Sequence, residues 1–176
     1  PDAKPVFDLD SVLIAQAAQT LNQGRDLAGN LLKNKPDFFI GAAVNPTATP
    51  SELELMKMQK KRLAGVQFFQ TQPVFEPERF VAFAKQAKAA DPSCKIIAGL
   101  MFIKSEKMAR YINENIAGIH IPEDIIVRTR DAADKKETAV RIVSAIAKDI
   151  RSSADGFHIM PMGWDSHVEP LLAEIR

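Results

Sequence analysis

Short apolar runs alternate along this chain with amphipathic segments long enough to form helices, and this alternation constrains the fold more than any other feature. The apolar runs predict strands over residues 38–44, 66–72, 95–102 and 156–162, with a short extended piece over 118–122. The segments between them predict helices over residues 10–23, 51–64, 77–87, 105–113, 123–152 and 166–175.

Strands that alternate with helices are joined most economically in a parallel sheet, because each crossover must return the chain to the same edge. The strand spacing is nearly even, which indicates repeated βα units. Four principal units are visible, whereas a closed (β/α)8 TIM barrel takes about 250 residues. We therefore expect an α/β fold in which residues 1–176 form half of a single TIM-barrel domain.

Half a barrel buries one face of its sheet under helices but leaves the other face and two strand edges open, which is costly. We expect a missing half, or a partner, to cover them, and we expect self-association while they are exposed. Pro1 stands where an initiator methionine is usual, which indicates a fragment, a processed product or the visible part of a longer polypeptide.

The predicted helix over residues 51–64 carries two local signals. Ser51, followed three residues later by Glu54, forms a capping-box pattern at its start. Its apolar residues predict the face that packs on the sheet. That face consists of Leu53, Met56, Leu63 and Ala64.

Composition excludes several classes of protein. The chain has 23 Lys and Arg against 22 Asp and Glu, so affinity for nucleic acid is not expected. No run approaches the roughly 18 apolar residues of a membrane helix, and the N-terminus lacks the apolar core of a signal peptide, which favours the cytoplasm. The single cysteine, Cys94, allows no internal disulfide and lacks the spacing of a metal site.

The end of the second predicted strand is the strongest functional signal. Thr71 and Gln72 follow an apolar run and precede Pro73, so they fall where the strand leaves the core. In parallel α/β sheets the carboxyl ends of the strands form the ligand-binding edge. The alternative is that Gln72 only caps its own loop with its side-chain amide.

Five segments together resemble the C-terminal half of methylenetetrahydrofolate reductases, and the resemblance covers essentially the whole chain. The runs from Ala64 to Phe75 and from Asp155 to Met160 are the most specific of them, the first with the order Thr-Gln-Pro-Val-Phe at its end. The segments are residues 37–46, 64–75, 95–99, 118–123 and 155–160. The resemblance implies the last four βα units of a TIM barrel, with the N-terminal half absent from this chain.

The same resemblance implies a cytoplasmic flavoprotein of one-carbon metabolism, linked to methionine biosynthesis, in which FAD carries hydride to 5,10-methylenetetrahydrofolate and yields the 5-methyl form. Gln72 matches the folate-contacting glutamine of the family, with Thr71 beside it. A side-chain amide offers both a donor and an acceptor to a pterin edge. Phe102 and Met101, at the end of the third strand, are candidates to line the pocket.

The resemblance also places FAD contacts on the helix before that strand. Lys60 and Lys61 match residues that hold the diphosphate, and Glu54 matches an acidic residue near the ribose. Lys57 stands where better-known members carry Asn. The alternative for this basic run, which includes Arg62, is a solvated helix face.

The end of the first strand is expected beside the flavin ring. Ala42, Ala43 and Asn45 fall there in the family, and small side chains allow a flat ring to approach the backbone. Core packing is the alternative. Trp164 and Met162, near the end of the last strand, are candidates to flank the flavin or a partner.

The sequence leaves the catalytic acid and the electron donor unassigned. The Glu that acts as catalytic acid in the family lies upstream of this chain, so no catalytic residue is assigned. His120 and His158 lie in apolar runs, where a core histidine is the commoner case. NADH, NADPH and a redox partner subunit are all compatible electron donors. The alternative function is a non-catalytic folate- or flavin-binding subunit of a reductase-like complex.

Overall fold

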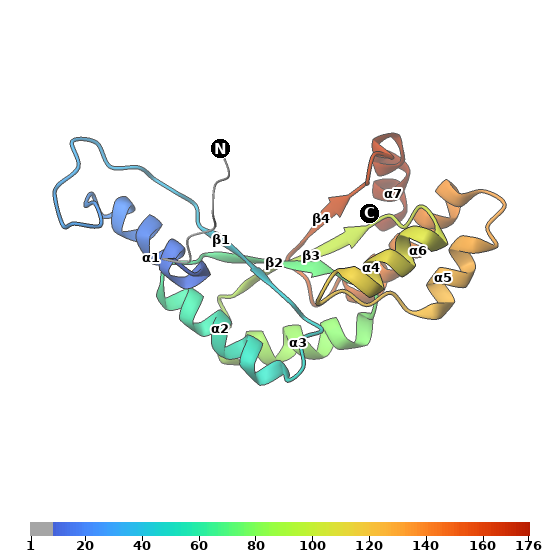
Figure 1. The fold of residues 1–176 in the computed structure, drawn as a ribbon, viewed down its shortest axis with the longest axis horizontal. Coiled ribbons are helices and arrows are strands. Elements are labelled where there is room, and N and C mark those ends of the chain that lie inside the picture. The colour runs from blue at the N-terminus through green and yellow to red at the C-terminus, as the bar shows by residue number, and fades with distance from the viewer. Residues whose placement is uncertain (1–8) are drawn as a thin grey trace.

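The computed structural model describes residues 9–176, in which helices and strands alternate along the chain (Figure 1). The first half contains α1 (Ser11–Asn22), β1 (Gly41–Val44), α2 (Ser51–Leu63), β2 (Phe68–Pro73), α3 (Pro77–Ala90) and β3 (Lys95–Met101). The second half contains α4 (Glu106–Asn115), α5 (Glu123–Arg130), α6 (Lys135–Ile150), β4 (Gly156–Met160), the 3-10 turn η1 (Asp165–His167) and α7 (Val168–Ile175).

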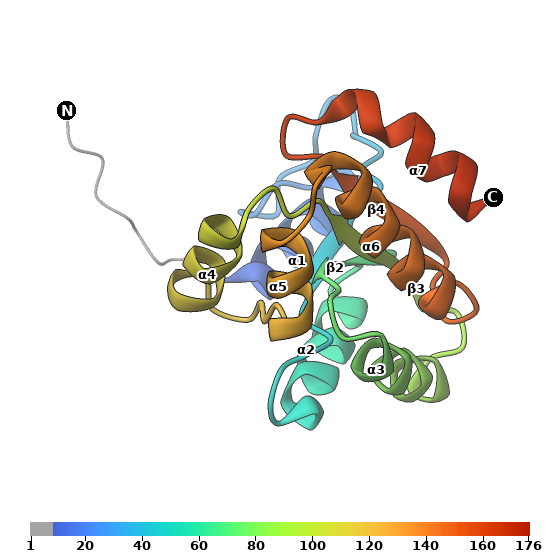
Figure 2. The ribbon, with the colours of Figure 1, turned by 90° about the vertical axis from the view of Figure 1, so that its right-hand side faces the viewer.

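The four strands form one parallel sheet in the order β1-β2-β3-β4, so each strand lies beside its neighbour in the sequence. This confirms the predicted α/β fold and parallel sheet. The helices cover one face of the sheet, and α6 packs on both α3 and α7 in a row along one flank (Figure 2). None of the helices within residues 9–176 is long and apolar enough to cross a bilayer.

The sheet has a helix-covered face and an opposite face, which we call the open face. Along β2 buried residues alternate with half-buried ones, because successive side chains of a strand point to opposite sides. Phe69 and Thr71 face the helices and are at most 4% exposed, whereas Phe68, Gln70 and Gln72 lie on the open face. The core therefore lies on one side of the sheet, where Phe69 and Ile96 meet helix residues such as Phe80 and Ile150.

Two helices were predicted well from the sequence. Asp10 caps α1, with its carboxylate accepting hydrogen bonds from the N–H groups of Val12 and Leu13 at 2.9 and 2.8 Å. In α3 the predicted apolar face is the buried one. Its buried residues are Phe80, Phe83, Ala84 and Ala87.

The first strand is shorter than predicted. Residues 38–40 do not join the β1 ladder, and side-chain amides bind this segment instead. Asn22 accepts from the N–H of Phe38 and donates to its carbonyl, at 2.8 and 2.9 Å, and Gln67 accepts from the N–H of Ile40 at 2.9 Å. These side-chain bonds, together with a hydrogen bond of 2.7 Å from the N–H of Gln67 to the carbonyl of Ile40, hold the segment beside the start of β2.

The extended piece expected over residues 118–122 does not join the sheet. The side chain of Asn113, in α4, donates to the carbonyl of Ile121 and accepts from its N–H, at 2.9 and 2.8 Å. This segment is thus held by a helix side chain rather than by a strand.

The long helix predicted over residues 123–152 is two helices, and the prediction of one was wrong. Asp134 begins α6, because its carboxylate accepts from the N–H groups of Lys136 and Glu137 at 2.9 and 3.0 Å. The apolar residues predicted for its buried face are buried. They are Val140, Ile142, Val143, Ile146 and Ile150.

Both local predictions for α2 were largely wrong. Ser51 is the first helical residue rather than the cap, and its helix has no side-chain cap. Among the residues expected on the inner face only Ala64 is buried; the side chains of Leu53 and Met56 are about half exposed and Leu63 is 90% exposed. The buried residues of α2 are Glu54, Met58 and Lys61.

Candidate functional site

The carboxyl end of the open face contains Gln72, half-buried at the end of β2. Two positions earlier, Gln70 pairs with Ala43 of β1, so both point to the open face. A shallow hollow of about 330 Å³ lies there, lined by Gly41, Ala42, Ala43, Phe68 and Gln70. Small residues on β1 and amide side chains on β2 therefore share one part of this face.

An apolar floor continues from Gln72 across β3 and β4. A Cβ atom on Gly99 would lie 3.0 Å from the carbonyl oxygen of Gln72 and 3.1 Å from the methyl carbon of Met160, so the Met160 side chain lies over Gly99. Met101 pairs with Met160, and His158 pairs with Gly99 on the same face. Two thioether groups and the imidazole of His158 thus lie on the face next to Gln72.

Thr71 supports Gln72 from the opposite side of the strand. Its hydroxyl accepts a hydrogen bond from the N–H of Gly99 at 2.9 Å and donates to the carbonyl of Gln72 at 2.7 Å. The β2–β3 register shifts between Gln70 and Pro73, as in a β-bulge, which redirects the side chains around it. Because Thr71 is 4% exposed and its hydroxyl is engaged, the structure gives it a positioning role rather than a ligand contact.

Phe102 does not line the open face. It is 1% exposed, and its N–H donates to the carbonyl of Met160 at 3.1 Å. Side chains alternate along the strand, so Met101 points to the open face and Phe102 into the core. Met101 is itself only 6% exposed, so of these two candidate pocket residues it lies on the expected face but is largely covered, and Phe102 lies on the other face.

The basic residues of α2 do not converge on one point. Successive helix residues are about 100° apart, so Lys60, Lys61 and Arg62 point in three directions. Lys60 is exposed and takes part in none of the ion pairs among residues 9–176. Lys57 is largely exposed, with its ammonium 3.6 Å from the carboxylate of Glu54.

Lys61 and Glu54 both bind the backbone of the first strand. The Lys61 ammonium donates to the carbonyl of Ala43 at 2.8 Å, and the Glu54 carboxylate accepts from the N–H of Asn45 at 3.0 Å. Lys61 is 8% and Glu54 9% exposed. Buried polar groups are retained when they are hydrogen-bonded, which explains why α2 turns these charged residues inward.

These two contacts lie on the edge of β1 that faces away from β2. The carbonyl of Ile40 accepts from the N–H of Gln67, so the carbonyl of Ala43, three residues on, points the other way. In a parallel ladder the carbonyl of one residue and the N–H two residues later bind the same residue of the neighbouring strand. On this free edge of β1, the Lys61 ammonium therefore takes the place of a neighbouring strand's N–H, and the Glu54 carboxylate takes the place of its carbonyl.

Asn45 is also engaged in its own loop. Its side-chain oxygen accepts from the N–H and the hydroxyl of Thr47 at 3.0 and 2.9 Å, and Thr47 donates to the carbonyl of Gly118 at 3.3 Å. The loop after β1 is thereby tied to the segment after α4. At this edge Glu76 lies 3.5 Å from the Arg79 guanidinium and 3.4 Å from His120.

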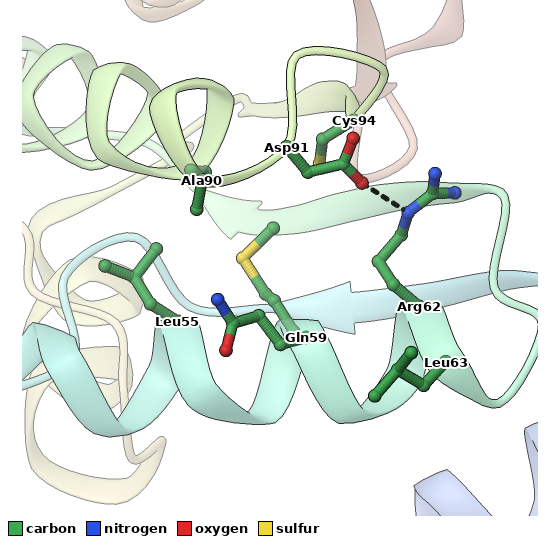
Figure 3. Close-up of a pocket in the computed structure, with 9 residues that line it drawn as sticks. Leu55, Gln59, Arg62, Leu63, Ala90, Asp91 and Cys94 are labelled. Atoms are coloured by element: carbon green, nitrogen blue, oxygen red, sulfur yellow. Dashed lines mark hydrogen bonds and ion pairs between the residues drawn. The ribbon is translucent and has the colours of Figure 1, made fainter.

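A deeper hollow of about 330 Å³ lies elsewhere, between α2 and α3 (Figure 3). It adjoins Asp91 and Cys94, which precede β3 and so lie at the amino end of the strands, opposite the ligand-binding edge. The Arg62 guanidinium lies 2.8 Å from Asp91 and also donates to Val66 and Ser93.

The ionisable groups of this hollow have structural roles. The Ser93 hydroxyl, followed by Arg62, lowers the pKa of Asp91, and burial raises the pKa of the Cys94 thiol. Asp91 is therefore held as a carboxylate and Cys94 as a thiol, so this hollow is not a candidate catalytic site.

Trp164 and Met162, expected to flank the flavin or a partner, lie at the carboxyl end of the sheet beside Lys104 and Gly163, to which the sequence assigned no role. Lys104, after β3, places its ammonium 5.5 Å from the ring centroid of Trp164, after β4. Met162 and Gly163, between β4 and Trp164, have positive φ angles of 54° and 83°. The Pro-Met-Gly-Trp run directly after a strand was the available signal, because proline and glycine there predict a sharp turn.

Comparisons with known proteins agree with this architecture. A family model described as methylenetetrahydrofolate reductase matches residues 8–175. The 5,10-methylenetetrahydrofolate reductase of Salmonella typhimurium (strain LT2) is 27% identical over 142 residues, which cover 76% of this chain and 47% of that protein. The chain thus spans about half the length of this curated relative.

A solved structure shows the same fold. It is described as an uncharacterized protein from Clostridium thermocellum that binds two copies of 5-methyl-5,6,7,8-tetrahydrofolic acid. The alignment covers 98% of this chain and 64% of that one, with a TM-score of 0.65 and 17% identity. Because the family model spans nearly all of the sequence, the chain belongs to the methylenetetrahydrofolate reductase family.

Proposed function

We propose that this chain forms the folate-binding part of a flavin-dependent enzyme that reduces 5,10-methylenetetrahydrofolate to 5-methyltetrahydrofolate. The observation that carries the proposal is the position of Gln72 at the carboxyl end of the open face, in a chain of this family. The solved relative described as binding a methyltetrahydrofolate supports a folate ligand. We further propose that the four βα units form half of a TIM barrel.

Gln72 has the chemistry to orient a pterin. Its amide presents one acceptor and two donor hydrogens, which match the amino and ring-nitrogen edge of the heterocycle. Thr71 holds the carbonyl of Gln72, so the strand end is fixed before the ligand arrives. Gly99 lets the Met160 side chain lie against β3 next to Gln72, where its thioether can supply an apolar contact for a ring.

The chain fits FAD in part. Gly41 and Ala43 leave a flat surface on β1 that suits an isoalloxazine ring. The α2 residues expected to contact the diphosphate and ribose of FAD fit that role poorly. Lys61 and Glu54 are buried and already bind the backbone, so among these residues only Lys60 is an unengaged cation. When bound, FAD would supply the hydride, and the protein would supply orientation.

A non-catalytic folate- or flavin-binding subunit is the second candidate, and one observation favours it. Among the described residues, the strands place no carboxylate on the open face at their ligand-binding ends. Ring opening of the folate needs a general acid within hydrogen-bond reach. Reduction therefore requires a carboxyl group that these strands do not supply, along with an electron donor such as NADH, NADPH or a redox partner subunit.

The test compares Gln72→Leu with Gln86→Leu, an exposed glutamine on α3, in the protein expressed from its complete reading frame. Gln72→Leu should weaken folate binding by about tenfold to a hundredfold, because pterin groups would lose their partners, and should leave flavin content unchanged. The assay is reoxidation of the reduced flavin by methylenetetrahydrofolate.

Three results would count against this scheme in different ways. Equal loss of flavin and folate binding in Gln72→Leu would contradict the pocket model, as would no loss of either. A wild-type protein that binds the folate but never exchanges electrons with it would establish the non-catalytic subunit.

A further inference from the structure

The outer face of α2 carries an apolar stripe that points away from the sheet, on the outside of the helix layer (Figure 1). Leu63 is 90% exposed, and Leu53 and Met56 are about half exposed. Because successive helix residues are about 100° apart, Met56 and Leu63 lie on one line, opposite the buried side of the helix. Single exposed apolar side chains are ordinary, but three on one helix face form a patch of the kind that marks an interaction site.

The hollow between α2 and α3 extends this stripe into a groove of about 330 Å³ (Figure 3). Its walls are mostly apolar, with Leu55, Gln59 and Leu63 on α2 and the small residues Ala87 and Ala90 on α3. Close-packed protein leaves few voids larger than a water molecule, so a groove of this size is suited to receive a side chain from outside.

The charges on α2 match a second copy of the same helix. Glu52, in the first turn, and Lys60, in the last turn, are exposed, and neither takes part in an ion pair among residues 9–176. They lie eight residues apart, about 12 Å along the helix axis, which is too far to pair within one chain. An antiparallel copy brings the acidic start of each helix beside the basic end of the other.

The stripe also reads the same in both directions. Leu53 and Leu63 lie near opposite ends of α2, ten residues or about 15 Å apart, with Met56 between them. Antiparallel packing with Leu53 beside Leu63 of the second copy places Met56 against the aliphatic stem of Lys60 of that copy. Glu52 then lies within one helical turn of the same ammonium. A two-fold dimer needs a surface of this kind, because one patch serves on both copies.

We propose that the outer face of α2 and the adjoining groove form the interface between two copies of this chain, packed antiparallel about a two-fold axis. Met56 and Leu63 are the apolar anchors, and the two pairs of Glu52 with Lys60 fix the orientation. A partner on the open face would lie on the other side of the sheet and would leave this stripe exposed. The inference therefore goes beyond the proposed function and does not depend on it.

The test measures self-association by sedimentation equilibrium in the protein expressed from its complete reading frame. The wild type should form dimers, and Leu63→Glu should weaken the dimer by about tenfold to a hundredfold, because a carboxylate would replace an apolar anchor. Leu31→Glu, at a leucine that is 77% exposed and lies outside the stripe, is the matched control and should dimerise as the wild type does. Circular dichroism checks that both variants keep the fold.

Charge reversal tests the antiparallel orientation. Glu52→Lys and Lys60→Glu should each weaken the dimer by about threefold to tenfold, because like charges would then face each other across the interface. The double variant should regain the affinity of the wild type, since each pair forms again with its charges exchanged. The two side chains do not pair within one chain, so this recovery reports a contact between copies.

Three results would overturn the proposal. A wild type that stays monomeric at every concentration measured would mean that another part of the complete chain, or a different partner, covers this face. Dimerisation of Leu63→Glu with wild-type affinity would place the interface elsewhere on the molecule. Failure of the double variant to recover would exclude antiparallel packing of α2.

Discussion

Replacing Glu54 tests whether α2 holds the outer edge of the first strand. In Glu54→Leu the N–H of Asn45 loses its acceptor at a position that is 9% exposed, while a side chain of similar size still fills the space. A buried donor without a partner costs about 1–3 kcal/mol. The exposed contact with Lys57 adds little, since surface ion pairs are worth about 0–1 kcal/mol.

We therefore expect Glu54→Leu to lower the free energy of unfolding by about 2 kcal/mol, which lowers the melting temperature by about 4–8 °C in a domain of this size. Glu54→Gln keeps a carbonyl acceptor and should cost less than about 1 kcal/mol. Glu52→Leu is the matched control, because Glu52 is an exposed acid in the same helical turn.

Two measurements check this prediction. Urea denaturation gives the change in stability, and amide hydrogen exchange reports the N–H of Asn45 directly. Lys61→Met removes the donor to the Ala43 carbonyl, and its effect should combine with that of Glu54→Leu less than additively, because both hold one strand end. Wild-type stability together with unchanged protection of the Asn45 amide in Glu54→Leu would refute the edge model.

Two further predictions concern the sheet. Gly99→Ala should destabilise the protein by about 1–3 kcal/mol, because the new methyl group would lie 2.9 Å from the Thr71 carbonyl oxygen. Gly156→Ala is the control and should cost less, because there is open space around Gly156. Equal urea midpoints for the two variants would contradict this prediction. For Asp155, burial raises the pKa, but the N–H of Ile96 and the ammonium groups of Lys88 and Lys95 outweigh burial and lower it. A pKa lowered by folding stabilises the fold at pH values above the pKa of Asp in the unfolded chain, about 4, and this stabilisation is lost as the pH falls below it. Asp155→Asn should therefore flatten the dependence of the free energy of unfolding on pH below about pH 4. The same pH dependence in the variant and the wild type would exclude the effect.

Local patterns were enough for most of the architecture. The four strands were predicted in the right places because apolar runs and crossover lengths are read directly from neighbouring residues. Gln72 was placed at a strand end for the same reason. The split between α5 and α6 was missed, although Asp134 is a helix-capping residue type, because the apolar stripe on either side masks the break.

Side-chain roles at the site were less predictable. Met101 and Phe102 are both apolar neighbours at one strand end, and only the strand register decides that Met101 faces the open side and Phe102 the core. The sequence also offers no way to see Lys104 and Trp164 as a pair. They are 60 residues apart, and they meet because β3 and β4 are adjacent and parallel.

The sequence by itself determined the α/β class and the parallel order of the strands, because these follow from periodicity and connection length. The tertiary structure decided which face of α2 is buried. Apolarity favoured Leu53, Met56 and Leu63, yet Glu54 and Lys61 are inside. The physical reason is that the outer edge of β1 presents an N–H and a carbonyl that need partners, and hydrogen bonds to them outweigh the burial of three apolar side chains.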